Sequence, residues 1–232
     1  MKKFKVVILT LCAGIVMAGC SNTAKGTAIG AAGGAVLGAV VGKLAGNTAI
    51  GAAVGGAVGA GAGALIGKKM DKVKAQAQAV QNAQVEEVKD ANGLDAVKVT
   101  FDSGILFTTG SATLSQTAKN SLTSFASVLK QNADCDVAVQ GYTDNAGWKN
   151  STAEQSAQKN LDLSQQRAQA VTSYLQSQGV SANQIRSTTG FGEANPVADN
   201  ATAAGKAQNR RVEVYMYASQ AMIQAAQNGT LQ

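Results

Sequence analysis

The sequence predicts a two-layer α/β domain in its second half, in which helices cover one face of a single sheet. Three observations lead to this fold class. Apolar and polar residues alternate over residues 97–101, as in a strand; two long segments carry one apolar face each, as in helices; and short β-rich segments follow both of them. A glycine-repeat region, which predicts a helical hairpin, precedes this domain.

The first residues have the features of a secretory signal. Residues 1–5 are basic, and Val6–Val16 is an apolar run too short to span a bilayer. Met17-Ala18-Gly19-Cys20 resembles a bacterial lipobox, in which the Cys20 thiol accepts diacylglycerol. We therefore expect residues 1–19 to be a lipoprotein signal peptide, with acyl chains on Cys20 as a membrane anchor. Ser21 is compatible with transport to the outer membrane. The competing interpretation is an ordinary signal peptide with a chance cysteine.

Glycines recur every fourth residue between the signal and the domain. The two series are Gly26, Gly30, Gly34, Gly38, Gly42, Gly46 and Gly51, Gly55, Gly59, Gly63, Gly67. Residues four apart share one helix face, so each series forms a flat stripe on which another helix packs closely. Asn47-Thr48 fits the turn between two helices.

We expect residues 20–69 to hold the lipidated N-terminus and this hairpin. A glycine costs about 1 kcal/mol in a helix relative to alanine, so the hairpin needs a membrane, a partner hairpin or a homo-oligomer. The sequence leaves open which of these it is, and a flexible Gly/Ala linker is the alternative.

The remaining elements follow in order. Residues 70–92 lack the strong apolar face of a core helix and predict a solvated helical spacer. Residues 93–218 form the α/β domain, and 219–232 form a partly helical tail. Within the domain we expect strands at 97–101, 137–142, 185–189 and 212–216, a helix from Ser115 to about Gln131, and a second helix capped by Ser164 and ended at Gly179.

Composition excludes several functions. Histidine is absent, which removes the commonest general base and most zinc sites, so we expect no enzyme activity, no metal and no cofactor. The formal charge of +6 falls to +3 without Lys2, Lys3 and Lys5, too little to indicate nucleic acid binding. Cys135 has no evident disulfide partner and reads as a small buried residue that opens a strand.

An acid and several arginines stand next to predicted element ends. Asp144 follows a strand directly, and Arg167 lies one turn into the helix expected at Ser164, where a helix end favours anions. An aspartate binds an ammonium and an arginine binds a carboxylate through two parallel hydrogen bonds, so the pair suits a zwitterion. Of the adjacent Arg210 and Arg211, we expect only one to reach the ligand, and we favour Arg210.

Five segments, in order, resemble the OmpA-like peptidoglycan-binding family. They are Phe107–Leu114, Gly141–Gly147, Leu163–Ala168, Gly190–Pro196 and Thr202–Val214. The resemblance implies a βαβαβ-type mixed sheet and binding of the diaminopimelate of the peptidoglycan stem peptide. It implies that Asp144 and Arg167 hold this group, and it adds Thr143, Asn160, Arg210 and Arg211 to the site. The glycine repeat is similar to the glycine-zipper segment of some lipoproteins of this kind.

The sequence departs from the family pattern between the two principal contacts. The stretch from Gly147 to Asn160 is longer than usual and includes Trp148–Ser156. It either forms a lid or bulges outward. Thr108 stands where many relatives carry an acid or amide, so no ligand contact is expected there.

The expected function is a non-catalytic tether between the outer membrane and peptidoglycan, with the domain in the periplasm. Its partners would be the stem peptide and outer membrane lipid, with a homo-oligomer through the glycine zipper left open. The alternative is an assembly protein, a pore or an envelope complex component, in which wall binding is ancillary.

Overall fold

The computed structural model describes residues 59–90, 92–108 and 110–231. The predictions for the signal peptide, for Cys20 and for most of the glycine repeat lie outside the described residues. The elements are α3 (Ala60–Gln78), β1 (Ala83–Lys89), β2 (Asp95–Asp102), α4 (Ser103–Leu106), α5 (Gln116–Gln131), β3 (Cys135–Gly141), α6 (Ala153–Ser177), β4 (Ile185–Gly190), α7 (Ala203–Asn209), β5 (Arg211–Ala218) and α8 (Gln220–Gln227).

The described strands form one mixed sheet, as predicted. Their order is β1-β2-β5-β3-β4, with β3 and β4 parallel and the other neighbours antiparallel. The register places Val99 opposite Val214 and Val214 opposite Val139, so the three central strands present a continuous apolar row. That row is fully buried and forms the floor of the core.

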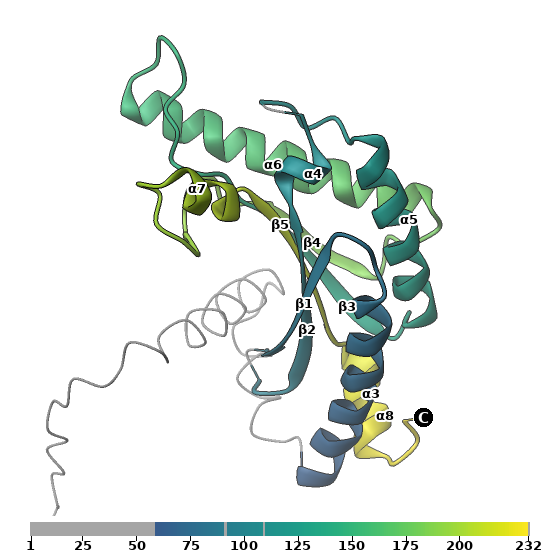
Figure 1. Ribbon diagram of the computed structural model, residues 1–232. Coiled ribbons are helices and arrows are strands. Elements are labelled where there is room, and N and C mark those ends of the chain that lie inside the picture. The colour runs from purple at the N-terminus through teal and green to yellow at the C-terminus, as the bar shows by residue number, and fades with distance from the viewer. Residues whose placement is uncertain (1–58, 91, 109, 232) are drawn as a thin grey trace, which may run out of the picture.

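Helices cover one face of the sheet, which confirms the two-layer α/β class (Figure 1). Ser115 caps α5 by accepting a hydrogen bond from the Ala118 backbone, as expected. Phe125 of α5 packs edge-on against Phe101 of β2, with ring centroids 5.6 Å apart. The expected terminal helix is α8, which packs against α3. No helix in the described ranges is long and apolar enough to cross a membrane.

The prediction of a solvated helical spacer over 70–92 is wrong. The helix α3 begins earlier, at Ala60, ends at Gln78 and packs against β1, β2 and α8, while Ala83–Lys89 is the edge strand β1. Ile66 and Met70, one turn apart, are fully buried, so one face of α3 is part of the core. Asn82 adopts a left-handed conformation, with φ of 60°, where the chain reverses between helix and strand.

The predicted start of α6 at Ser164 is also wrong. Thr152 begins the helix with a capping box, in which its hydroxyl and the Gln155 side chain exchange hydrogen bonds with the two backbones. Ser164 is instead fully buried within the helix, where its Oγ donates to the Leu161 carbonyl (2.7 Å) and accepts from the Gly192 N–H (2.8 Å). The long segment is therefore divided: residues 147–152 form a loop, and residues 153–160 are the first turns of α6.

Two glycines let α6 rest directly on the sheet. A Cβ on Gly141, at the end of β3, would come closer than 3.0 Å to the Ser164 carbonyl oxygen. A Cβ on Gly190, at the end of β4, would collide in the same way with the backbone of Gln165. Because both obstacles are backbone atoms, no side-chain rotation relieves them.

Replacing Gly190 by alanine should therefore lower the free energy of unfolding. Overpacking of this kind costs about 1–3 kcal/mol. Denaturant unfolding followed by circular dichroism measures the change. Gly147→Ala is the matched control, because its new methyl would meet nothing closer than Ser156 Oγ at 3.8 Å. Equal stability of the two variants would contradict the close approach.

The packing of α3 predicts a second stability difference. Ile66→Ala should destabilise the domain by about 2–5 kcal/mol, because it removes a buried side chain and leaves a cavity. Thermal unfolding of the purified protein measures the effect. Lys72→Ala, at an exposed position of the same helix, serves as control. A solvated spacer would leave the domain unaffected by either substitution.

The thiol of Cys135 is buried at the start of β3, as predicted. Burial raises its pKa from 9.0 to about 12. We expect almost no reaction with a thiol reagent at pH 8 until the protein is unfolded by denaturant. The unfolded thiol ionises at lower pH than the folded one, so its contribution to stability is present below pH 9 and is lost as pH rises toward 12. A Cys135→Ser variant shows how much of the labelling comes from this thiol. Rapid labelling of Cys135 in the folded protein would contradict its burial.

Candidate binding site for a zwitterionic ligand

A cleft of about 940 Å³ lies where the end of β3, the helices α4, α6 and α7, and the segment after α4 meet. Its lining residues are Ser103, Gly104, Phe107, Thr108, Gly110, Ser115, Thr143, Asp144, Ala146, Gly147, Trp148, Lys149, Asn160, Leu163, Arg167, Lys206 and Arg210. Five of the six predicted ligand contacts are among them, and Arg211 is not. The fold therefore brings together residues that are far apart in the sequence.

Asp144 lies just beyond β3 and is buried, with only 7% of its surface exposed. Its Oδ1 accepts a hydrogen bond from the Ala146 backbone (3.1 Å), as in an Asx-turn, and its Oδ2 pairs with Arg210 Nη1 (2.5 Å). A carboxylate has about four acceptor positions, so these two bonds leave room for an ammonium. The acid is thus held in place before any ligand arrives.

Arg167 projects into the cleft from the middle of α6, about four turns from the helix start. The helix N-terminus consequently contributes nothing to anion binding there, contrary to the prediction. Its Nε donates to the Ser111 carbonyl (3.0 Å), and its guanidinium lies over the Phe107 ring at 5.2 Å. The two terminal nitrogens make no hydrogen bond to other described residues and present a fork to a carboxylate.

Burial is the main reason that the pKa of Arg167 is lowered. The positive charge of Arg210 lowers it further, while Asp144 acts in the opposite direction. Arginine remains protonated in proteins, so the residue keeps its charge but lacks full compensation for it. An anion bound at Arg167 would supply that compensation.

Two buried hydroxyls at the cleft have no hydrogen-bond partner in the described structure. Thr143 Oγ1 and Ser103 Oγ are both unpaired, and the two residues are 4% and 2% exposed. A buried hydroxyl without a partner is costly, so both sites favour a polar ligand group. Thr143 was predicted. Ser103 was missed, because its sequence context, at the start of the short helix α4 directly after a strand, carries no ligand-binding signal.

Asn160 lines the cleft but its amide is occupied by the protein. Its Nδ2 donates to the carbonyls of Ala146 (3.2 Å) and Asp144 (3.4 Å), and its Oδ1 accepts from Trp148 Nε1 (2.8 Å). These bonds fasten the loop after β3 to α6. Asn160 therefore positions the loop after β3, and its amide group is already hydrogen-bonded within the protein.

Arg211 lies away from the cleft in a buried network. Its Nε pairs with Glu213 Oε1 (2.7 Å), and its guanidinium covers the Tyr142 ring at 3.8 Å. It also donates to the Asn195 carbonyl (3.2 Å), which holds the loop between β4 and α7. Of the two adjacent arginines, Arg210 lines the cleft, whereas Arg211 makes buried contacts within the protein.

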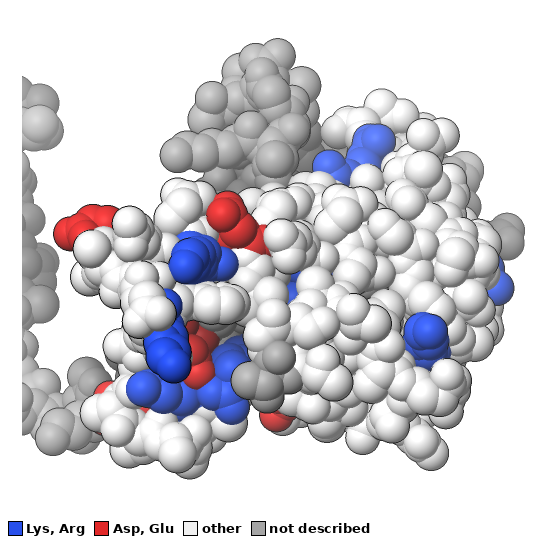
Figure 2. All heavy atoms as spheres, turned by 90° about the horizontal axis from the view of Figure 1, so that it is seen from above, with Lys and Arg blue, Asp and Glu red and all other residues white. Residues whose placement is uncertain are grey.

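The electrostatics of the cleft are dominated by cations around one acid. Figure 2 shows basic side chains gathered about acidic ones at the end of the molecule that carries α7 and the start of α6. Within the described ranges no group of three or more histidine, cysteine or acidic residues is placed to hold a metal ion. The arrangement is suited to holding an ammonium and a carboxylate.

The fold is thus a two-layer α/β domain with an acid at a strand end and an arginine on the facing helix, both lining one cleft. Residues 106–210 match the model of the OmpA family, and residues 1–71 match that of the YMGG-like Gly-zipper. The chain therefore carries an OmpA family domain.

Curated relatives agree with this family. The chain is 42% identical over 141 residues to "Probable lipoprotein YiaD" of Escherichia coli strain K12, covering 58% of this chain and 60% of that protein. It is 45% identical over 89 residues to "Peptidoglycan-binding protein ArfA" of Mycobacterium tuberculosis strain H37Rv, covering 38% of this chain and 24% of that protein. The chain thus spans less than two thirds of the length of either relative.

Solved structures share the fold. The cell wall anchor of the T6SS from Pseudomonas aeruginosa is 30% identical with a TM-score of 0.51, covering 65% of this chain and 97% of that one. A putative MotB like protein from Desulfovibrio vulgaris has a TM-score of 0.55 at 21% identity, covering 67% and 94%. The second likeness concerns the fold alone.

Proposed function

We propose that this protein is a non-catalytic lipoprotein that attaches the outer membrane to peptidoglycan by binding the diaminopimelate of the stem peptide. The observation that carries the proposal is the cleft in which Asp144 and the free guanidinium fork of Arg167 face the same space. Diaminopimelate presents an ammonium and a carboxylate on one carbon. The acid would take the ammonium and the arginine the carboxylate.

The buried groups around this pair support the same ligand. The Arg210–Asp144 ion pair orients the acid toward the cleft. The unpaired hydroxyls of Thr143 and Ser103 would bond to the ammonium or carboxylate, which removes the cost of their burial. A rigid, partly desolvated site of this kind loses little entropy on binding.

The names of the relatives support wall attachment and membrane location. One relative is a probable lipoprotein, one is a peptidoglycan-binding protein and one structure is a cell wall anchor. The Outer membrane porin F of Pseudomonas aeruginosa is 35% identical over 127 residues. With acyl chains on Cys20, the domain would lie in the periplasm. Holding without chemistry agrees with a chain that lacks histidine.

The glycine repeat favours a second candidate function. Residues 1–71 match the YMGG-like Gly-zipper, and glycine stripes promote close helix association. In this alternative the chain assembles into an envelope complex or pore, and wall binding is ancillary. Chemical cross-linking of the protein in membranes separates the two: a ladder of oligomers favours assembly, and a single monomer band favours a simple tether.

The binding site is tested with two charge variants. Asp144→Asn keeps an oxygen for the Ala146 N–H but removes the negative charge, and Arg167→Lys keeps the charge but removes the planar fork. Each should weaken binding to purified sacculi at least tenfold, because each deprives a ligand group of its charged partner, at a cost of about 1.4 kcal/mol or more. Pull-down of the protein with sacculi measures this loss.

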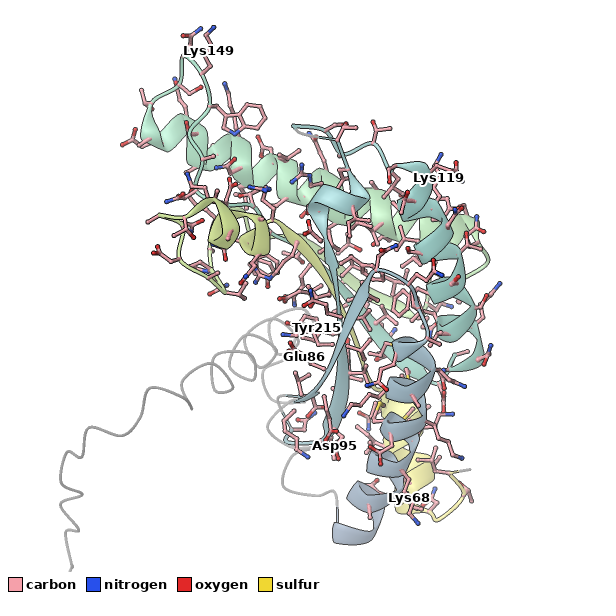
Figure 3. The ribbon with its side chains drawn as sticks, in the orientation of Figure 1. Lys68, Glu86, Asp95, Lys119, Lys149 and Tyr215 are labelled. Carbon is pink, nitrogen blue, oxygen red and sulfur yellow. The ribbon has the colours of Figure 1, made fainter. Side chains whose placement is uncertain are left out.

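Controls make the outcome specific. Lys119→Gln lies on α5, outside the cleft (Figure 3), and should bind as the native protein does. Free diaminopimelate should compete with sacculi for the native protein. Circular dichroism shows that the variants are folded. Unchanged binding by both cleft variants would overturn the site.

A further inference from the structure

The cleft has more positive charge than one zwitterionic centre requires. Its ionisable lining residues are one acid, Asp144, and four cations, Lys149, Arg167, Lys206 and Arg210. A single amino acid head group carries one positive and one negative charge and would leave this excess in place. The volume of about 940 Å³ is also that of a drug-sized ligand, much larger than one head group.

The four cations of the cleft differ in the partners that their charges have. Arg210 is paired with Asp144, and Arg167 is the partner expected for the head-group carboxylate. Lys149 stands at the tip of the arm formed by the loop before α6 and points away from the domain (Figure 3). Lys206 remains: it lines the cleft from α7 and is half-buried, and its side-chain ammonium makes no hydrogen bond or ion pair with other described residues.

The position of Lys206 is fixed by its surroundings. The helix α7 is capped by Thr202, whose Oγ1 accepts from the Gly205 N–H (3.0 Å). Gly205 packs so closely on the Asp199 carbonyl that a Cβ there would collide with it. Asn209, at the end of the helix, is fully buried and binds the loop before α7 through four hydrogen bonds. The backbone of Lys206 is thus held at one wall of the cleft, which its side chain lines.

We infer that Lys206 forms a second anionic subsite, which binds a second carboxylate of the same peptide. This inference rests on the proposed function, because it extends the ligand from its diaminopimelate head group. In a stem peptide the neighbouring glutamate is linked through its side chain and keeps its α-carboxylate. The protein therefore selects stem peptides in which this carboxylate is free over those in which it is an amide.

The test compares two soluble peptides on the full-length protein in detergent. One is L-Ala-γ-D-Glu-diaminopimelate, and the other is the same peptide with the glutamate α-carboxylate converted to an amide. Isothermal titration calorimetry should show that the native protein binds the free acid about two- to fivefold more tightly, the range for one partly exposed ion pair. The Lys206→Gln variant should lose this preference by weakening only toward the free acid. Lys119→Gln should keep it.

Each result bears on the inference. Equal binding of the two peptides by the native protein would overturn the subsite while leaving diaminopimelate binding intact. A Lys206→Gln variant that keeps the preference for the free acid would also overturn the subsite. Equal weakening of this variant toward both peptides would overturn it too, because a structural role of Lys206 predicts that result. Loss of binding to both peptides in the Asp144→Asn variant supports the head-group site. Absence of any peptide binding by the native protein would contradict the proposed function as well as the subsite.

Discussion

The contact of the α6 backbone with the ends of β3 and β4 is the constraint on which the site depends. Gly141 meets the Ser164 carbonyl and Gly190 meets the Gln165 backbone, because neither glycine has a side chain to hold the helix away from the strand end. Asp144 follows Gly141 by three residues, and Arg167 follows Ser164 by one helical turn. The glycine contact therefore fixes the acid and the arginine relative to each other, as a clamp for a small zwitterion requires.

The same contact explains why the long segment before Asn160 does not disturb the site. The second part of the segment, residues 153–160, forms helical turns that extend α6 beyond the domain (Figure 1), started by the capping box at Thr152. Its loop is then fastened back by the Trp148 indole on Asn160 Oδ1 and by the Trp148 N–H on Ser156 Oγ. The extension thus adds a wall to the cleft without changing the register between α6 and β3.

The sequence predicted the parts of the fold whose patterns reflect burial. The strands β2, β3 and β5 alternate or run apolar, and α5 has a strong apolar face with a serine cap, so their positions were found. The edge strand β1 was missed because Ala83–Lys89 is rich in glutamine, glutamate and lysine and is exposed on one side, a composition that also suits a helix. Ser164 misled because a serine before a helical pattern resembles a cap, whereas here its hydroxyl bonds within the helix and to Gly192.

The sequence patterns pointed to residues that line the cleft where they follow a strand or lie in a recognisable motif, as Asp144, Thr143 and Arg167 do. The inward position of Ser103 depends instead on the turn at α4, which no local pattern reveals.

The adjacent arginines show how the fold separates binding from support. Arg210 ends α7 and Arg211 begins β5, so their side chains leave the backbone toward different surroundings. Glu213 neutralises Arg211 inside the protein, and Tyr215 donates a second hydrogen bond to that acid (2.6 Å). Without this internal partner, Arg211 would be a buried charge lacking compensation close to the site. Because Glu213 neutralises Arg211, Asp144 pairs with Arg210 alone. The positive charge that remains in the cleft belongs to Arg167 and the lysines, where a carboxylate ligand can neutralise it.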